Sequence, residues 1–119
     1  NYSDFVYSSL FDCISASTLN LNEKISPSTF YLYQNHPNPF NPVTQINYQL
    51  SKNSHIKIEV YDMMGKLVKT LVNEFQSPGF RSLKWNGQNF ENQKVSSGVY
   101  FYSLQSESFS ATKKMILLD

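Results

Sequence analysis

The sequence predicts an all-β fold, an immunoglobulin-like antiparallel β-sandwich of about seven strands with an N-terminal extended or linker segment. Three observations support this prediction. Short segments after residue 43 alternate apolar and polar residues, which is typical of strands that bury one face. Glycine, proline and asparagine clusters separate these segments at the spacing of a sandwich. No convincing amphipathic helix follows residue 30.

Residues 1–29 differ from the rest, and we interpret them as a linker or the tail of a preceding domain. Within them, residues 15–28 are rich in Ser, Thr and Asn, with Leu19, Leu21 and Ile25 in partial alternation. An alternative is a strand that pairs with this domain or with a neighbouring molecule. We expect the sandwich domain itself to comprise residues 30–119.

A stiff segment from Asn35 to Pro42, called the strap below, opens this domain. Its three prolines fix φ and remove hydrogen-bond donors. Each proline also pushes the preceding residue into extended geometry. The strap should therefore be irregular, neither a helix nor a central strand. A strand is expected directly after it over residues 44–50, where Ile46, Tyr48 and Leu50 share one face.

The next two strands are expected to form a hairpin. The first covers residues 55–61, where alternate residues are apolar. Asp62 and Gly65 then suit the first and last positions of a type I turn, and glycine reaches positive φ without penalty. The second covers residues 66–72, and its inward face is ambiguous because both faces carry apolar residues.

Turn signals also delimit the rest of the chain, where Gly87 breaks one strand and Gly98 opens another. Trp85 should belong to the core, because aromatic side chains dominate core burial. The strand that Gly98 opens is apolar on both faces, as expected of a central strand. The remaining strands are expected over residues 80–85, 95–96 (a short piece), 98–104 and 108–118.

Composition excludes several classes of function. The net charge of +1 on 119 residues argues against a nucleic-acid footprint, which needs a clustered basic face. No apolar run approaches the roughly 18 residues of a membrane span. The chain starts at Asn1 without the features of a signal peptide, so we expect a mature form or a fragment if the protein is exported.

The potentially reactive residues are few and isolated. Cys13 is the only cysteine, which rules out a disulfide within the chain. A buried thiol is expected there, and a bridge to another molecule stays open. His36 and His55 lack the partner spacing of a metal site or a catalytic triad. We therefore predict no catalysis, no cofactor, no metal and no small-molecule substrate.

Several ordered blocks together carry a family resemblance. They are residues 32–42, 60–68, 70–72, 85–87, 97–102 and 113–117, with Thr44, Ile46, Tyr48 and Leu50. With these blocks, the sequence from about Phe30 onward resembles the type A C-terminal sorting domain of the type IX secretion system. That family is similar in turn to the immunoglobulin-like domain of flagellar hook-capping proteins. Two positions depart from it: Asn92 aligns where glycine is usual, and His36 where an aromatic is common.

The resemblance implies a non-catalytic address label at the C-terminus of a larger protein of a Gram-negative bacterium, secreted or held at the cell surface. Its partners would be an outer-membrane translocon and, in many members, a surface sortase of the cysteine-protease type that removes the label. Residues 15–28 are the candidate place for such a cleavage.

We expect two surfaces to be recognised by these partners. A stiff strap has a low ordering cost on binding, and asparagine offers donors and acceptors. A terminal strand is commonly an edge that can pair with a partner. An alternative is that both segments only cap and fill the sandwich. The recognition candidates are Asn35, Pro37, Asn38, Pro39, Phe40, Asn41, Pro42, Lys113, Lys114 and Met115; Asp62, Gly65, Gly87 and Gly98 are expected to be structural turn residues.

Two other functions stay open at this point. In the first, the domain is an assembly module of a surface filament or layer, and residues 1–29 pair with a neighbouring copy in a homo-oligomer. In the second, it is an accessory glycan-binding domain of a secreted hydrolase. An exposed planar row drawn from Tyr31, Tyr33, Tyr61 and Tyr100 would favour the glycan-binding function.

Overall fold

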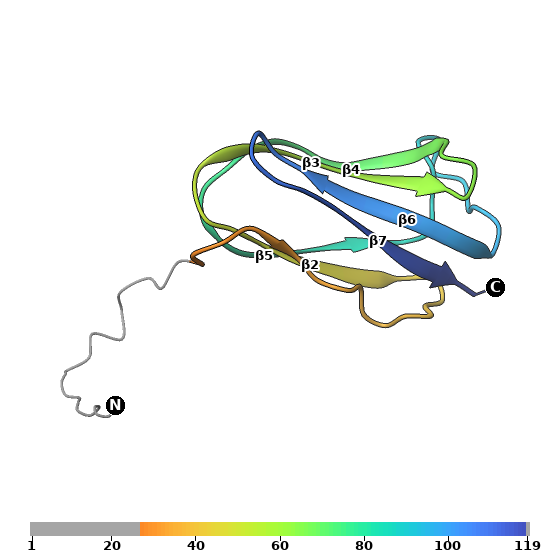
Figure 1. Cartoon of the computed structure of the whole chain (residues 1–119). Coiled ribbons are helices and arrows are strands. Elements are labelled where there is room, and N and C mark those ends of the chain that lie inside the picture. The colour runs from red at the N-terminus through yellow and green to blue at the C-terminus, as the bar shows by residue number, and fades with distance from the viewer. Residues whose placement is uncertain (1–26, 119) are drawn as a thin grey trace, which may run out of the picture.

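The computed structural model describes residues 27–118, whose seven strands form two antiparallel sheets (Figure 1). The three-stranded sheet has the order β1-β2-β5, and the four-stranded sheet has the order β4-β3-β6-β7. This arrangement confirms the predicted all-β sandwich. The predictions on residues 1–26, Cys13 included, lie outside the described residues. The strands are β1 (Tyr31–Leu32), β2 (Thr44–Leu50), β3 (Ser54–Asp62), β4 (Leu67–Gln76), β5 (Gly79–Trp85), β6 (Gly98–Gln105) and β7 (Ser110–Leu117).

Two details of the strand count differ from expectation. β1 was not predicted, because a two-residue strand is too short to show periodicity; it pairs Leu32 with Tyr48 of β2. Residues 95–96 do not form a strand. Instead, the Val95 N–H donates to the Gly87 carbonyl at 3.0 Å, which closes the loop between β5 and β6.

The ambiguous inward face of β4 has a structural cause. Its pairing with β3 shifts register twice, so that Leu71 and Val68 each stand as an extra residue opposite the partner strand. A β-bulge changes which face the following residues occupy. Val68 is buried, and Leu71 and Val72 are both half-buried although they are consecutive. The two bulges within the edge strand β4 thus explain why apolar residues occur at both odd and even positions.

The core lies between the two sheets and centres on Trp85. Its ring lies 5.8 Å from the Phe40 ring and 5.6 Å from the Tyr100 ring, centroid to centroid. The indole N–H donates to the Gln88 carbonyl at 3.0 Å, so its polar atom is satisfied. Trp85 is 1% exposed, which confirms its predicted core position.

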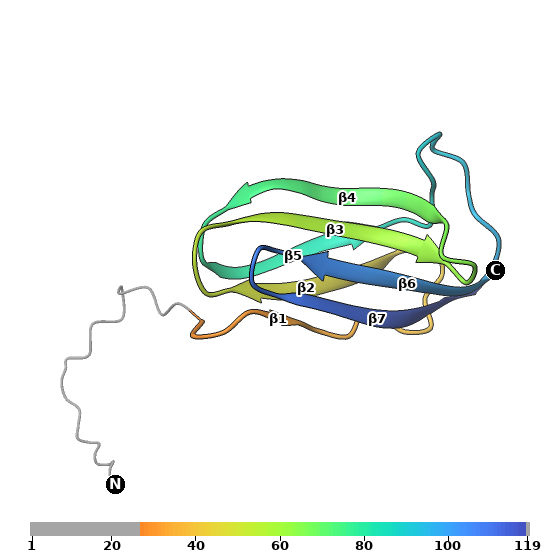
Figure 2. The same cartoon turned by 45° about the horizontal axis from the view of Figure 1, so that its top comes forward.

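The connections between strands bring the two ends of the domain's chain together. β3–β4 and β6–β7 are consecutive neighbours within the four-stranded sheet, whereas β4 to β5 and β5 to β6 cross between the sheets. β6 is flanked by β3 and β7, which confirms its predicted central place. Figure 2 shows β7 at the margin of its sheet, beside β1 of the other sheet. The segment that joins β1 to β2 is therefore close to β7.

Tyr102 should make the domain sensitive to alkaline pH. Burial raises the pKa of Tyr102 to about 12, and its hydroxyl donates to the Tyr33 carbonyl at 2.7 Å. Because the folded pKa lies above the unfolded one, its contribution is complete below pH 10 and is lost as the pH rises toward 12. We expect a loss of roughly 2–3 kcal/mol over this window.

Urea unfolding between pH 8 and 12 measures this loss. Tyr102→Phe should cost about 1 kcal/mol near neutral pH through the missing hydrogen bond. It should also flatten the alkaline decline. Part of the decline should persist, since burial raises the pKa of Tyr48 as well. An unchanged alkaline slope in Tyr102→Phe would contradict the assignment.

Candidate recognition site

The strap begins with a buried asparagine that organises its first turn. Asn35 is only 3% exposed, and its side-chain N–H groups donate to the Pro37 carbonyl at 3.0 Å and to Thr44 Oγ1 at 2.9 Å. Thr44 Oγ1 in turn donates to the Pro37 carbonyl at 2.9 Å. Gln34 Nε2 donates to Asn35 Oδ1 at 2.7 Å. The Asn35 amide is thus used inside the domain, and it fixes the strap on the start of β2.

Phe40 fastens the middle of the strap to the core. It is 1% exposed and packs on Trp85. Full burial of a phenylalanine stabilises a fold by about 1.5–3 kcal/mol relative to an exposed one. The prolines on either side are exposed, and the peptide bonds before Pro37, Pro39 and Pro42 are cis. The strap is therefore an ordered surface segment held by one buried ring.

The strap also pairs with the end of β7. The Phe40 N–H donates to the Ile116 carbonyl at 3.0 Å, and the Leu118 N–H donates to the Phe40 carbonyl at 2.8 Å. These bonds form a parallel bridge between Phe40 and Leu117. The edge of a sheet otherwise presents unpaired backbone groups. Over its last residues, the outer edge of β7 is covered by the strap.

Two side chains extend this pairing. Asn38 Oδ1 accepts a hydrogen bond from the Ile116 N–H at 3.0 Å. Gln34 Nε2 donates to the Lys114 carbonyl at 2.7 Å. All these contacts involve backbone groups of Lys114, Ile116 and Leu118. These are alternate residues, so their backbone groups face the same side of the strand. The two surfaces that the sequence suggested separately thus form a single unit, called the strap–β7 unit below.

The recognition candidates divide by exposure. Asn35, Phe40 and Met115 are buried, so a partner would touch them only after a rearrangement. Lys113 is half-buried, with its Nζ 5.9 Å from the centre of the Tyr31 ring. Lys113 and Lys114 point to opposite faces of β7, as consecutive strand residues do. The exposed candidates are Pro37, Asn38, Pro39, Asn41, Pro42 and Lys114.

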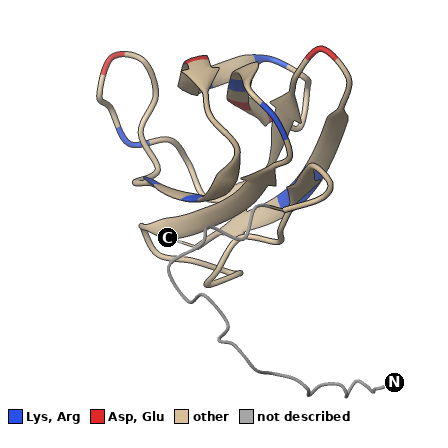
Figure 3. Ribbon diagram, turned by 90° about the vertical axis from the view of Figure 1, so that its left-hand side faces the viewer, with Lys and Arg blue, Asp and Glu red and all other residues tan. Residues whose placement is uncertain are grey.

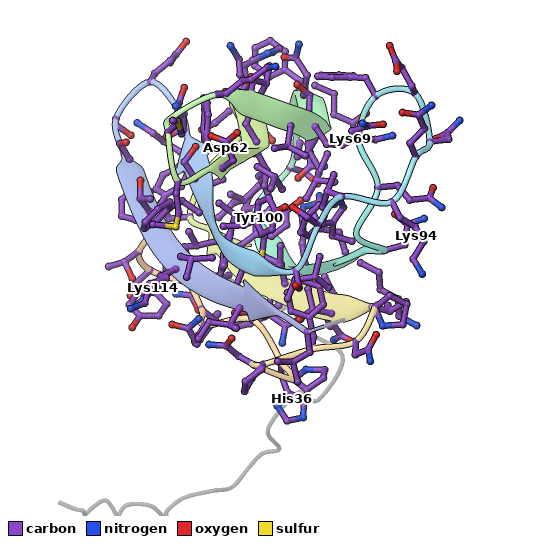
Figure 4. All side chains as sticks on the ribbon, turned by 90° about the vertical axis from the view of Figure 1, so that its right-hand side faces the viewer. His36, Asp62, Lys69, Lys94, Tyr100 and Lys114 are labelled. Carbon is purple, nitrogen blue, oxygen red and sulfur yellow. The ribbon has the colours of Figure 1, made fainter. Side chains whose placement is uncertain are left out.

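Figure 4 looks onto the end of the domain that carries this unit. Lys114 and His36 lie in the lower part of the view, while Asp62 and Lys69 lie in the upper part. Lys114 and His36 thus lie away from Asp62, where the β3–β4 turn begins.

Asp62, Gly65 and Gly87 each lie in a tight turn or a close backbone approach. Asp62 Oδ1 accepts from the Met64 and Lys66 N–H groups, both at 2.9 Å. Gly65 has a φ of 84° in the same turn, where a side chain would be strained. Gly87 has a φ of 75°, and a Cβ there would stand 3.3 Å from the Pro42 carbonyl oxygen. Gly87 thus lets the loop after β5 approach the end of the strap.

The position where the family usually has glycine keeps its backbone shape. Asn92 has a φ of 62°, in the left-handed region that asparagine tolerates. Its N–H donates to the Asn89 carbonyl at 3.0 Å. Asn89 Oδ1 accepts from the Glu91 and Gln93 N–H groups, so the loop is internally hydrogen-bonded.

The four tyrosines do not form one exposed row. Tyr31 and Tyr33 are exposed neighbours, with ring planes 65° apart. Tyr100 is buried, and its hydroxyl donates to the Ser96 carbonyl at 2.6 Å. The Tyr61 hydroxyl donates to Glu59 at 2.5 Å on the four-stranded sheet, and this bond raises its pKa. The planar surface that would favour a glycan-binding domain of a hydrolase is thus not made by these residues.

The described residues form neither a cluster of metal ligands nor a helix that could span a membrane. No group of three or more His, Cys, Asp or Glu among residues 27–118 could hold a metal ion. The His55 ring instead bonds Asn73 Oδ1 at 2.7 Å and packs edge-on against Phe75. Over the same residues, no helix is long and apolar enough to cross a membrane.

Solved structures share this fold at low sequence identity. PorZ, a surface component of the type-IX secretion system of Porphyromonas gingivalis, matches 76% of the chain with a TM-score of 0.52 and 19% identity. Latent dimeric PorU from the same organism matches 81% with a TM-score of 0.60 and 20% identity. The hook-capping protein FlgD of Xanthomonas campestris matches 76% with a TM-score of 0.50 and 17% identity, and 63% of FlgD is covered.

The chain corresponds to only a small part of the first two of these proteins. It covers 11% of the PorZ chain and 10% of the PorU chain. No curated protein matches it. The fold and these coverages define its class, a β-sandwich module that also occurs within much larger proteins.

The family is shown by a direct match. The model of the secretion system C-terminal sorting domain matches residues 34–118, which is more than half of the chain, and the chain belongs to this family. The resemblance to type IX sorting domains is thereby confirmed. The chain is a non-catalytic C-terminal sorting domain, a signal for secretion and surface attachment.

Proposed function

We propose that the folded domain, residues 30–119, is the label by which an outer-membrane translocon selects a larger exported protein. The observation that carries this proposal is the family match, which includes the whole strap and the last strand. A boundary near residue 30 is supported by Phe30, whose ring stacks on Phe109 at 5.7 Å. β1 begins one residue later.

Recognition would use the exposed side of the strap–β7 unit. Phe40 and the hydrogen bonds to Ile116 and Leu118 hold this surface in shape before binding. A preorganised surface loses less conformational entropy when a partner binds. Lys114 adds an exposed positive charge for which no ion pair is found among the described residues. The translocon would therefore contact a rigid proline-asparagine rim next to one lysine.

A reporter assay tests the function. A fluorescent protein with a signal peptide is fused to residues 27–119 and expressed in a bacterium with a type IX secretion system. We expect the fusion at the cell surface or in the medium, and the reporter with the signal peptide alone in the periplasm. A folded fusion that stays in the periplasm would contradict the proposed function.

The surface assignment has its own matched test. Lys114→Glu should lower export at least about tenfold, because it replaces an exposed positive charge of this surface by a negative one. Lys52→Glu makes the same charge change at an exposed site in the β2–β3 turn and should export normally. Both variants should melt within a few degrees of the parent. Normal export of Lys114→Glu would overturn the role of this surface and leave the sorting function intact.

A surface sortase would cut the chain before the domain, within residues 15–28. Mass spectrometry of the surface protein from the native bacterium checks this. A processed protein should end within this segment. Retention of residues 30–119 in the mature protein would instead support an assembly module.

A further inference from the structure

The outer face of the three-stranded sheet carries a groove whose lining includes no residue of the strap or of β7. The groove is open, has a volume of about 340 Å³, and its lining includes Tyr33, Asn47, Phe80 and Ser82. Tyr33 and Phe80 are large apolar residues that are 40% and 66% exposed. Two exposed aromatic rings at one groove form an apolar surface that a ligand can contact.

The floor of the groove offers free hydrogen-bonding groups. Asn47 pairs with Ser82 across the two strands. Asn47 Oδ1 accepts from Gln45 Nε2 at 3.0 Å, whereas no partner of the Asn47 amide N–H groups is found among residues 27–118. Nor is a partner of the Ser82 hydroxyl found among these residues. Amide and hydroxyl groups of this kind can bond the hydroxyls of a sugar.

The strands of this face carry basic residues and no acidic ones, although Glu74 of β4 acts on Tyr48, which also lines the groove. Residues 27–50 and 77–90, which contain all three strands of the sheet, include no Asp or Glu. Lys84 and Arg81 lie on β5, and neither forms an ion pair with another described residue. Figure 3 shows the acidic segments in the upper part of the view, on the side of the four-stranded sheet. The described acidic residues are Glu59, Asp62, Glu74, Glu91 and Glu107.

We propose that this face binds an acidic polysaccharide, a chain whose sugars carry carboxylate groups. Tyr33 and Phe80 would pack on the apolar faces of sugar rings, as aromatic side chains do with flat apolar surfaces. Asn47 and Ser82 would bond sugar hydroxyls, and Lys84 would attract the carboxylates. The groove shares no residue with the strap or β7, so variants of the groove leave the residues of the proposed recognition surface unchanged.

The test uses the full 119-residue chain and two polymers, polygalacturonate and uncharged dextran. Binding is followed by isothermal titration at low and at moderate salt. We expect polygalacturonate to bind, to bind more weakly as salt is added, and to bind more tightly than dextran. Absence of polygalacturonate binding, or equal binding of dextran, would overturn the proposal.

Matched variants locate the site. Phe80→Ala should weaken binding roughly fivefold or more. Phe75→Ala removes an equally exposed ring from the four-stranded sheet and should change nothing. Lys84→Gln should weaken binding roughly two- to threefold, whereas Lys66→Gln in the β3–β4 turn should not. Equal effects of Phe80→Ala and Phe75→Ala on polygalacturonate binding, with both variants folded, would contradict the assignment.

Discussion

Replacing Phe40 by alanine should destabilise the domain by about 3–5 kcal/mol, the usual cost of truncating a buried phenylalanine. The ring is 1% exposed and contacts Trp85, so its loss leaves a cavity beside the centre of the core. It also frees the strap from its main apolar contact. For a domain of this size, the melting temperature should fall by roughly 12 °C or more.

Thermal and urea unfolding of the purified chain measure this effect. Phe75→Ala is the matched control, since Phe75 is 71% exposed and should cost no more than about 0.5 kcal/mol. A Phe40→Ala variant as stable as Phe75→Ala would mean that the strap does not depend on the core. It would remove the physical basis of a preorganised recognition surface.

Deleting residues 115–119 should unfold the domain. Met115 and Leu117 are 0% and 5% exposed, and each buried side chain contributes about 1.5–3 kcal/mol. The deletion also removes Ile116 and Leu118, whose backbone groups pair with Phe40. The combined loss approaches the roughly 5–15 kcal/mol that stabilises a whole small domain.

The control for this deletion removes only residues 118–119. Leu118 is 48% exposed, and its main contribution is one backbone hydrogen bond to Phe40, worth about 1 kcal/mol. Circular dichroism should report a folded protein for the shorter deletion and an unfolded one for the longer. A folded domain after the longer deletion would show that β7 is dispensable for the sandwich. If the longer deletion unfolds, its failure to export would not identify a recognition site.

The fold was predictable because most strands show a local alternation of apolar and polar residues. In β2 the residues Ile46, Tyr48 and Leu50 alternate with polar ones, and the structure buries all three. The inward face of β4 was harder to predict, since its two bulges place apolar residues at both odd and even positions. β1 could not be predicted, because its two residues depend on pairing with Tyr48 and Gln49 far along the chain.

The candidate site was predicted in its parts and not in its assembly. The proline-asparagine composition identified the strap, yet no local signal links Asn38 to Ile116 or Gln34 to Lys114. These contacts join residues about 80 positions apart in sequence. Asn35 shows that composition alone does not identify a contact residue, since its amide donates to the strap's own backbone and to Thr44. Whether such a residue contacts a partner or stabilises the domain depends on its burial, which is a property of the folded domain.

Photo-crosslinking in living cells tests the central claim most directly. A photo-reactive amino acid replaces Lys114 in the exported fusion, and in a second fusion it replaces Asn53, which is exposed in the β2–β3 turn. If the strap–β7 unit is what the machinery reads, the probe at Lys114 should crosslink to an outer-membrane component, and the probe at Asn53 should not. Crosslinking from Asn53 alone, with both fusions exported, would contradict the account.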